Sequence, residues 1–337
     1  MFNDNVCGVD LGTSTVKLYS QRNSHILTEK TMVAIRNRTQ VIAVGNDAFE
    51  MYEKNPPDIS VDRPVINGSI ADVDEVEILL RILLHRADPN LGKAPAICFS
   101  APVNMPELEK RAYYAIGHTR ALGNTRVYLV DRPVCDAIAL GIPLSRTKGT
   151  MIVNMGARNT DLSILANDQV IISRSIPIGG QNLNEAIQSE IRRKNNLLIG
   201  KRTARRLKAV LATFEGDLRE ARRVTGVHTL SGLPRESIVS SALVRDAVER
   251  EVGELAEQIR TFLERTPPQI GKCIMDEGVY LTGGTSRIPG IDQFLTSRLG
   301  CRVNLSPHYE MNTILGIREL ITHRDLQKWA YSIRKKR

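Results

Sequence analysis

A short polar turn near the start of the sequence has residue types that suit anion binding. An apolar strand, 6-VCGVD-10, leads into the turn, and a second strand, 16-VKLYS-20, leaves it. Glycine allows a tight turn in which successive N–H groups point at one phosphate. An aspartate beside phosphate oxygens needs a cation between them, most simply Mg²⁺ bound through water, which assigns Asp10 to metal binding. The turn consists of a glycine and three hydroxyl residues: Gly12, Thr13, Ser14 and Thr15. An ordinary hairpin with a glycine bulge would fit the same residues.

The same pattern returns in the middle of the chain, at 151-MIVNMGARNTDLSILAND-168. Asn154 matches Asp10, and Gly156 matches Gly12. Two such hairpins predict two similar α/β domains, each offering one turn to a shared cleft, unless the similarity arises by chance. The second turn would be Gly156, Ala157, Arg158 and Asn159.

A third element lies in 278-GVYLTGGTSRIPGIDQFLTSRLG-300. An apolar strand ends at paired glycines, and a helix is expected from about Pro289. A strand, paired glycines and a helix N-terminus let flat or anionic groups approach the backbone closely. The candidate binding residues here are Gly283, Gly284, Thr285 and Ser286.

The bulk composition fits a soluble globular protein of two domains or one duplicated domain. The chain has 337 residues, of which 42% are apolar and 25% charged. No apolar run reaches the length of a membrane span, and no signal peptide is visible, so we expect a cytosolic protein. The five cysteines are scattered singly, which predicts reduced, packed thiols.

The formal charge of +9 favours an anionic partner, such as a nucleotide, a nucleic acid or an acidic membrane surface. The charge is concentrated in the final IRKKR and in the segment from Arg192 to Arg223. Nucleic-acid binding is disfavoured, because aromatic residues make up only 4% of the chain.

Three segments have helical patterns that predict core packing. Residues 72–86 and 243–264 repeat apolar side chains at helical spacing, the latter from Val244 to Leu263. Residues 133–142 predict a short apolar helix that Pro133 opens at a favoured first-turn position.

The three turn elements together resemble the phosphate 1, phosphate 2 and adenosine motifs of the actin-like ATPase superfamily. Other stretches are similar to the bacterial MreB family of shape-determining actin homologues. They include 62-DRPVINGSIADVDEVEILLR-81, 127-VYLVDRPVCDAIALGIPL-144 and 178-IGGQNLNEAIQSEIRRKNNLLIGKRTARRLK-208. The resemblance covers nearly the whole chain.

This resemblance implies an α/β fold of duplicated RNase-H-like, actin-type domains around a nucleotide cleft, each with a smaller subdomain. Domain I would comprise residues 1–141 and 308–337, with its subdomain at about 32–71. Domain II would comprise residues 142–307, with its subdomain at about 178–249. The cofactors implied are ATP and Mg²⁺, the metal being held through water by Asp10 and Asp161.

The resemblance also implies a cytoskeletal function. Filaments of this chain, alone or with a paralogue, would lie at the inner face of the cytoplasmic membrane. There they would determine cell shape by organising cell-wall synthesis together with shape-determining membrane proteins. A small-molecule kinase or another ATPase of the same fold is the alternative, although little chain is left over for the acceptor pocket of a kinase.

The sequence departs from the family pattern at positions that bear on hydrolysis. Asn154 replaces the aspartate of the second phosphate turn, and Arg132 stands where the family's water-orienting glutamate is expected. A guanidinium stays protonated and cannot act as that carboxylate does, so a weak ATPase or none is expected. Asp161 and Asp136 are the candidate catalytic substitutes. On the nucleotide-base side, Arg205 and Arg206 replace family glutamates, whereas Lys208 is retained.

The resemblance implies membrane contact through an N-terminal amphipathic helix or a short apolar loop. Because the first strand begins too early to leave room for such a helix, contact is expected at two other places. The turn 88-DPNLGKAP-95 is expected to expose Leu91. The tail 326-LQKWAYSIRKKR-337 joins Trp329 and Tyr331 to a basic cluster, which suits an anionic interface. A frayed, solvated terminus is the alternative.

Overall fold

The computed structural model describes residues 2, 5–91, 95–103, 105–119, 122, 125–216 and 218–332. The chain divides into two compact units, each described by itself below. Unit 1 comprises Met1–Arg146, Asp168–Ser173 and Met311–Arg337, and unit 2 comprises Thr147–Asn167 and Arg174–Glu310.

Unit 1 is built on a six-stranded sheet in the order β19-β10-β9-β1-β2-β3. The first three strands of the chain are antiparallel neighbours, whereas β1, β9 and β10 run parallel. The strands are β1 (Val6–Leu11), β2 (Thr15–Ser20), β3 (His25–Lys30), β9 (Ala96–Ala101), β10 (Val127–Asp131) and β19 (Tyr331–Ser332).

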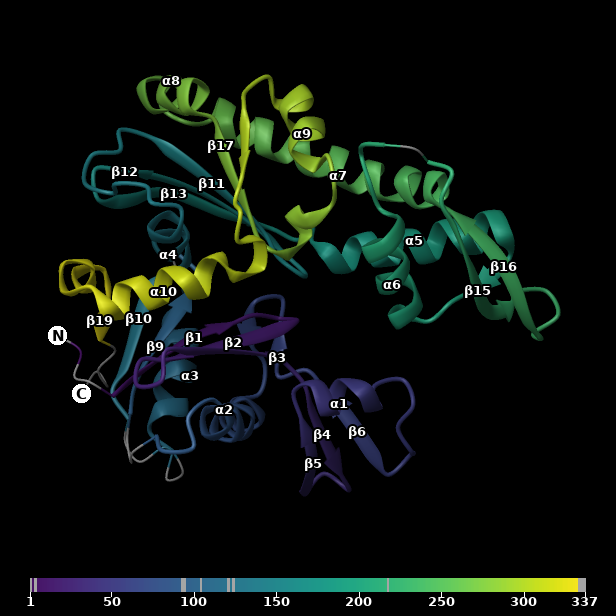
Figure 1. The fold of residues 1–337 in the computed structure, drawn as a ribbon, viewed down its shortest axis with the longest axis horizontal. Helices are drawn as coiled ribbons and strands as arrows, with labels where there is room; N and C mark the ends of the chain where they lie inside the picture. The colour runs from purple at the N-terminus through teal and green to yellow at the C-terminus, as the bar shows by residue number, and fades with distance from the viewer. Residues whose placement is uncertain are drawn as a thin grey trace. The chain divides into compact units, whose positions relative to one another are not determined.

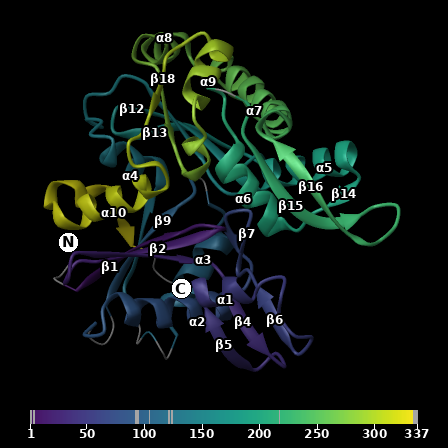
Figure 2. The same cartoon turned by 45° about the vertical axis from the view of Figure 1, so that its right-hand side comes forward.

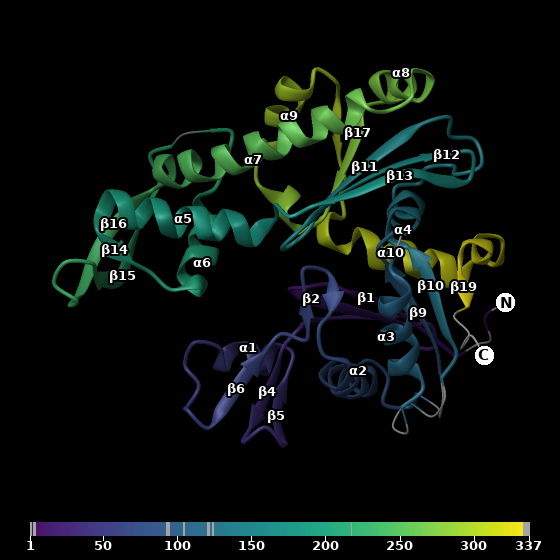
Figure 3. The same cartoon turned by 180° about the vertical axis from the view of Figure 1, so that it is seen from behind.

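Helices cover both faces of this sheet, with α2 (Val73–Ala87) and α3 (Glu107–Gly117) on one face and α4 (Arg132–Ala139) and α10 (Asn312–Thr322) on the other (Figures 1 and 3). The Asp72 side chain caps α2 by accepting from the Glu75 amide at 2.9 Å. The predicted helices at 72–86 and 133–142 are confirmed, although the second ends at Ala139. The 3₁₀ helix η3 (Arg324–Trp329) leads into β19.

A smaller part of unit 1 contains the sheet β5-β4-β6, whose strands are β4 (Val33–Arg36), β5 (Gln40–Val44) and β6 (Ile59–Asp62). The helix α1 (Asn46–Met51) packs against it around a small core of Met32, Ala34, Ala48 and Ile59. The hairpin of β7 (Val65–Ile66) and β8 (Ser69–Ile70) follows.

Unit 2 repeats this arrangement in a five-stranded sheet of order β13-β12-β11-β17-β18. Its strands are β11 (Thr150–Met155), β12 (Thr160–Ala166), β13 (Gln169–Ile176), β17 (Val279–Thr282) and β18 (Val303–Leu305). As in unit 1, an antiparallel hairpin is followed by parallel strands, here β11, β17 and β18. The helices α7 (Ser241–Glu264), α8 (Pro268–Glu277) and α9 (Ile291–Leu299) belong to this unit.

The smaller part of unit 2 is a three-stranded sheet with two helices (Figure 2). The strands, in the order β14-β15-β16, are β14 (Leu197–Leu198), β15 (Ala221–His228) and β16 (Pro234–Ser240). The helices are α5 (Gly180–Asn195) and α6 (Lys201–Leu211).

Two helix predictions in unit 2 need adjustment. The amphipathic stripe of α7 is buried as expected as far as Ile259, but it ends with buried Phe262 rather than with Leu263. The helix expected from Pro289 begins at Ile291, because the strand first leads into a 3₁₀ turn, η1 (Gly284–Arg287), and Gly290 then takes a left-handed conformation.

The cysteines are free thiols, as predicted, and all but Cys273 are buried. Burial raises the pKa of Cys98 to about 12. Within the ranges that the structure describes, no helix has both the length and the apolar character needed to cross a membrane.

Candidate nucleotide-binding site

The two hairpin turns are built in the same way. The Gly12 amide donates to the Thr15 carbonyl at 3.1 Å, and the Gly156 amide donates to the Asn159 carbonyl at 2.9 Å. A Cβ atom on either glycine would lie 2.8 Å from the same carbonyl oxygen, so neither turn has room for a side chain. The predicted correspondence of the two hairpins is therefore confirmed in atomic detail.

The strand register extends this correspondence to the residues before and after each turn. Asp10 lies directly opposite Lys17 in unit 1, and Asn154 lies directly opposite Asp161 in unit 2. Each hairpin thus has one acidic residue at this pair of positions. It lies on the first strand of the hairpin in unit 1 and on the second strand in unit 2.

The first turn is held by groups outside the hairpin. The Thr31 hydroxyl donates to the Gly12 carbonyl at 2.6 Å, and the Gly68 amide donates to the Thr13 hydroxyl at 2.9 Å. In the part of the chain that the structure describes, the amides of Thr13 and Ser14 donate to no acceptor. Adjacent amides of this kind, in a turn fixed from outside, suit an anion.

Asp10 lies beneath this turn in a buried ion pair. The Lys17 ammonium lies 2.8 Å from Oδ2, and the Ser100 hydroxyl donates to Oδ1 at 2.8 Å. Burial alone would raise the pKa of Asp10, but the charges of Lys17 and Arg132 and the two hydrogen bonds outweigh it, so the pKa is lowered. The carboxylate is therefore charged and already neutralised by the protein.

This arrangement bears on the expected Mg²⁺ site. Both oxygens of Asp10 have protein partners and the residue is only 6% exposed, so Asp10 does not fit as a direct metal ligand. Asp161 accepts a hydrogen bond from Ser175 at 2.7 Å. Among the described residues, no group of three or more His, Cys, Asp or Glu side chains is arranged to hold a metal ion.

The second turn is fixed by the start of α5. The Gly180 amide donates to the Gly156 carbonyl at 3.0 Å, and the Gln181 amide donates to the Ala157 carbonyl at 2.6 Å. These amides at the helix N-terminus are therefore used to position the turn. The Arg158 guanidinium lies 3.1 Å from Glu185 of the same helix, in an ion pair that draws the side chain toward α5.

Lys208 and Thr285 join this cluster in unit 2. The Lys208 ammonium donates to the Gly180 carbonyl, and the Thr285 hydroxyl donates to the Gly156 carbonyl at 2.9 Å. Burial, with the nearby charge of Arg205, lowers the pKa of Lys208 to about 8. The second turn, the start of α5, Lys208 and Thr285 are thus adjacent within unit 2.

The paired glycines after β17 differ in what they tolerate. Gly283 has a positive φ of 89°, and a Cβ there would overlap the Met155 carbonyl. Its own carbonyl accepts from the Ser286 hydroxyl at 2.6 Å. A Cβ on Gly284 would meet only the Glu310 side chain, at 3.4 Å. Gly283 is therefore required by the fold, whereas the backbone at Gly284 would accommodate a side chain.

Asp136, expected as a catalytic substitute, lies in a structural position. Its Oδ1 accepts from the Asn312 amide group at 3.1 Å and from the Thr313 hydroxyl at 2.7 Å. The buried carboxylate therefore ties α4 to the first residues of α10. Arg132, at the start of α4, is close enough to Asp10 for its charge to lower the pKa of that carboxyl.

The residues expected to contact a membrane are in part packed against other residues of unit 1. Leu91 is not exposed as expected but partly buried against the core of unit 1. The Lys328 ammonium lies 4.3 Å from the centre of the Trp329 ring, and Tyr331 is paired with Leu129 at the edge of the sheet. Burial raises the pKa of Tyr331 to about 12. The basic end of the tail, from residue 333, lies outside the described residues.

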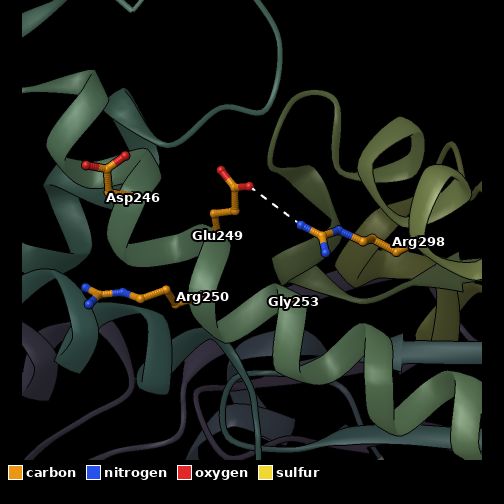
Figure 4. Close-up of a pocket in the computed structure, with 5 residues that line it drawn as sticks. All are labelled: Asp246, Glu249, Arg250, Gly253 and Arg298. Atoms are coloured by element: carbon orange, nitrogen blue, oxygen red, sulfur yellow. Dashed lines mark ion pairs between the residues drawn. The ribbon is translucent and has the colours of Figure 1, made fainter.

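A depression of about 360 Å³ lies between α7 and α9 of unit 2 (Figure 4). Its lining residues are Asp246, Glu249, Arg250, Gly253 and Arg298. The charged side chains are paired: Arg298 lies 3.9 Å from Glu249, Arg250 lies 2.7 Å from Glu190, and Asp246 lies 3.2 Å from Lys194. The charged side chains around this depression are therefore engaged in ion pairs, and none of them belongs to the candidate nucleotide-binding residues.

The chain is similar to a known family over nearly its whole length. The family model described as MreB/Mbl protein matches residues 4–328. The cell shape-determining protein Mbl of Bacillus subtilis (strain 168) is 32% identical over 295 residues, which cover 87% of this chain and 88% of that protein. The cell shape-determining protein MreB of Escherichia coli (strain K12) is 30% identical over 311 residues, covering 90% and 89%.

Solved structures show the fold. The crystal structure of MreB 5 of Spiroplasma citri bound to AMPPNP superposes with a TM-score of 0.89 at 26% identity, covering 96% of this chain and 97% of that one. The MamK double helical filament shares the fold, with a TM-score of 0.77 at 20% identity, covering 94% and 98%. The two units therefore have the actin-type architecture, and the chain belongs to the MreB/Mbl family of actin-like, cell shape-determining proteins.

Proposed function

We propose that this protein binds ATP and assembles into membrane-associated filaments that set cell shape by organising cell-wall synthesis. The observation that carries the nucleotide part is the pair of matching glycine turns, one in each unit. Each has the hydrogen bond from glycine to the third residue along, and each has no room for a Cβ atom. Each turn by itself suits a phosphate group of a nucleotide.

The residues of each unit fit their expected parts of the nucleotide. The amides of Thr13 and Ser14, with Lys17 beneath them, would receive phosphate oxygens in unit 1. In unit 2 the turn from Gly156 would do the same, while Lys208 and the open space at Gly284 suit the ribose and base. The Spiroplasma citri relative has been solved with AMPPNP and with ADP, which supports this assignment.

Mg²⁺ would accompany the phosphates rather than bind Asp10 directly, because Lys17 and Ser100 occupy both of its oxygens. Asp161, the acidic residue of the second hairpin, would make a water-mediated contact. The Lys17 ammonium would offset the charge of Asp10, which a metal ion would otherwise have to offset.

Hydrolysis would be slow. Arg132 cannot orient an attacking water as a carboxylate does, and Asn154 lacks the charge of the family's aspartate. The filament would then be stabilised by bound nucleotide and renewed slowly. Polymerisation alone and copolymerisation with a paralogue both fit this proposal.

A single substitution tests nucleotide binding without disturbing the fold. Gly284→Val adds bulk where only the Glu310 side chain is near, so the chain should fold normally. Titration with a fluorescent ATP analogue should show at least tenfold weaker binding. The matched control is Gly271→Val in α8, where a Cβ would meet nothing within 4 Å and where binding should be unchanged.

Filament formation is measured on the same proteins by pelleting with and without AMPPNP. We expect nucleotide to increase the pelleted fraction of the wild-type and Gly271→Val proteins but not of Gly284→Val. Equal nucleotide affinity in the two variants would remove the turn at Gly284 from the binding site.

A further inference from the structure

A second cation of unit 1 lies near the ion pair of Lys17 and Asp10. Arg132 is the first residue of α4 and follows β10 directly. In the sheet order, β10 is separated from β1 by β9 alone. The guanidinium therefore comes from the same part of unit 1 as the first phosphate turn, and its contribution to binding is a separate matter from hydrolysis.

The strand register places Arg132 level with the first turn. The strands β1, β9 and β10 run parallel, and their register puts the last residues of β1 and β10, Leu11 and Asp131, level with Ala101 of β9. Gly12 and Arg132 follow these residues, so both lie at the carboxyl edge of the sheet, about 10 Å apart across two strand spacings. The carboxyl edge of parallel strands is where such sheets bind ligands.

The Arg132 side chain is directed from β10 toward β9 and β1. Against the effect of burial, its charge lowers the pKa of Asp10 on β1. Burial raises the pKa of Tyr113 to about 12, and the charge of Arg132 is the largest influence that opposes this rise. The Tyr113 ring centre lies 5.1 Å from that of Phe99 on β9. The guanidinium is therefore near the end of β9, between α4 and the first turn.

The charged side chains at this edge leave a positive balance. The Lys17 ammonium lies 2.8 Å from Asp10 and neutralises it. Burial raises the pKa of Asp131, the residue before Arg132, and the charge of Lys110 opposes that effect. These five residues comprise three cations and two acids, hence one positive charge in excess. An anion beside the first turn would balance this charge.

The terminal phosphate of a nucleotide has the chemistry that this guanidinium recognises. The Thr13 and Ser14 amides suit the oxygens of one phosphate in the turn. A phosphate at the end of the chain has more unbridged oxygens and more negative charge than an inner one. The planar guanidinium of arginine binds two such oxygens at once, which an ammonium group cannot do.

We infer that the Arg132 guanidinium binds the terminal phosphate of a nucleoside triphosphate whose neighbouring phosphate lies in the turn from Gly12 to Thr15. Arg132 is then a specificity-determining residue, because ADP lacks the phosphate that it contacts. The inference rests on the proposed function, since it assigns one further residue of the same nucleotide site. It concerns the choice between ATP and ADP and does not depend on the rate of hydrolysis.

Calorimetric titration with AMPPNP and with ADP, at physiological ionic strength and one Mg²⁺ concentration, tests the inference. Arg132→Gln should weaken AMPPNP binding by about tenfold to a hundredfold, because charge-assisted hydrogen bonds to the phosphate are lost. ADP binding should change by less than about threefold, because salt screens charges that are not in contact. The control is Arg81→Gln on α2, where the arginine is 50% exposed and pairs with Glu77 of the same helix, so both affinities should be unchanged.

Arg132→Lys separates the charge from the geometry of the guanidinium. Lysine retains the charge but not the planar pair of donors, so AMPPNP binding should fall less than in Arg132→Gln, again without a change for ADP. Urea unfolding of each variant is measured in parallel, because the charge of Arg132 also acts on Asp10. If Arg132→Gln does not fold, the loss of AMPPNP binding in Arg132→Lys decides the question.

The ratio of the AMPPNP affinity to the ADP affinity is the decisive quantity. A merely structural arginine would change the urea midpoint and leave this ratio as in the wild type, which would overturn the inference. An equal loss of both affinities would overturn it as well, because Arg132 would then contact a phosphate that the two nucleotides share. Binding of neither nucleotide by the wild type would refute the proposed function itself, so the two failures are distinguishable.

Discussion

Replacing Lys17 with methionine should destabilise unit 1 strongly. Methionine retains much of the aliphatic length of lysine but leaves the buried Asp10 carboxylate without its ammonium partner. The Lys17 and Asp10 side chains are only 6% and 8% exposed, and their charged atoms lie 2.8 Å apart. The substitution therefore isolates the charge of Lys17 from its packing.

Removing one partner of a buried ion pair typically costs about 3–5 kcal/mol, because the other charge is left uncompensated. Ser100 still donates to Asp10 at 2.8 Å, and Arg132 still lowers its pKa. We therefore expect a loss of about 3 kcal/mol for Lys17→Met at neutral pH. Asp10→Asn added to Lys17→Met removes the orphaned charge and should restore part of that loss.

The assay is urea unfolding followed by tryptophan fluorescence. Trp329 is the sole tryptophan of the chain and belongs to unit 1, so its signal reports the unit that contains the ion pair. Circular dichroism follows both units in parallel. The double variant serves as the matched control, since it has the same methionine without the unpaired carboxylate.

The pH dependence gives a second readout. The pKa of Asp10 is lowered in the folded protein, so its stabilising effect is present above about pH 3.9 and is lost as the pH falls through the folded value. Without Lys17, burial meets less opposition and the pKa of Asp10 rises. The difference between wild type and Lys17→Met should then narrow as the pH is lowered from 7 toward 4. A loss below about 1 kcal/mol, or a double variant less stable than the single one, would refute this reasoning.

Two further predictions concern hydrolysis and packing. Arg132→Glu with Asn154→Asp should raise phosphate release by about a hundredfold or more, since one missing catalytic contact costs about that much; unchanged turnover would show that these residues do not limit the rate. Gly316→Ala should lower the free energy of unfolding by about 1–3 kcal/mol, because a Cβ there would overlap the Cys135 carbonyl where α4 and α10 meet. Urea unfolding followed by Trp329 fluorescence measures this loss, and a fully stable variant would contradict the close approach of the helices.

The elements of the fold were predictable where the sequence pattern was strictly local. The two glycine hairpins follow from a glycine between two strands, and α7 follows from its apolar stripe. The prediction from the apolar stripe was wrong in the last turn of α7, where Phe262 rather than Leu263 is buried. Adjacent apolar residues at a helix end differ by about 100° in direction, and tertiary packing decides which one points inward.

The candidate site was predictable in its turns but not in its charges. The pairing of Lys17 with Asp10 was not predicted, although a hairpin whose turn begins at Gly12 places residue 17 opposite residue 10. The hairpin pattern alone would therefore have predicted that Lys17 faces Asp10. Ser100 comes from a separate strand, and the effect of Arg132 on Asp10 acts through space, so neither was visible in local sequence. The exposure of Leu230 and Leu233 likewise depends on whether another part of the chain packs over their loop, which local sequence does not show.

Hydrogen–deuterium exchange with and without AMPPNP tests the central claim most directly. If both matching turns bind nucleotide, AMPPNP should slow exchange at residues 12–15 in unit 1 and at residues 156–159 and 283–286 in unit 2. The β15–β16 loop, which belongs to unit 2 but not to the proposed nucleotide site, serves as the internal reference. Protection confined to one unit, or absent from both turns, would contradict the claim that both duplicated turns bind nucleotide.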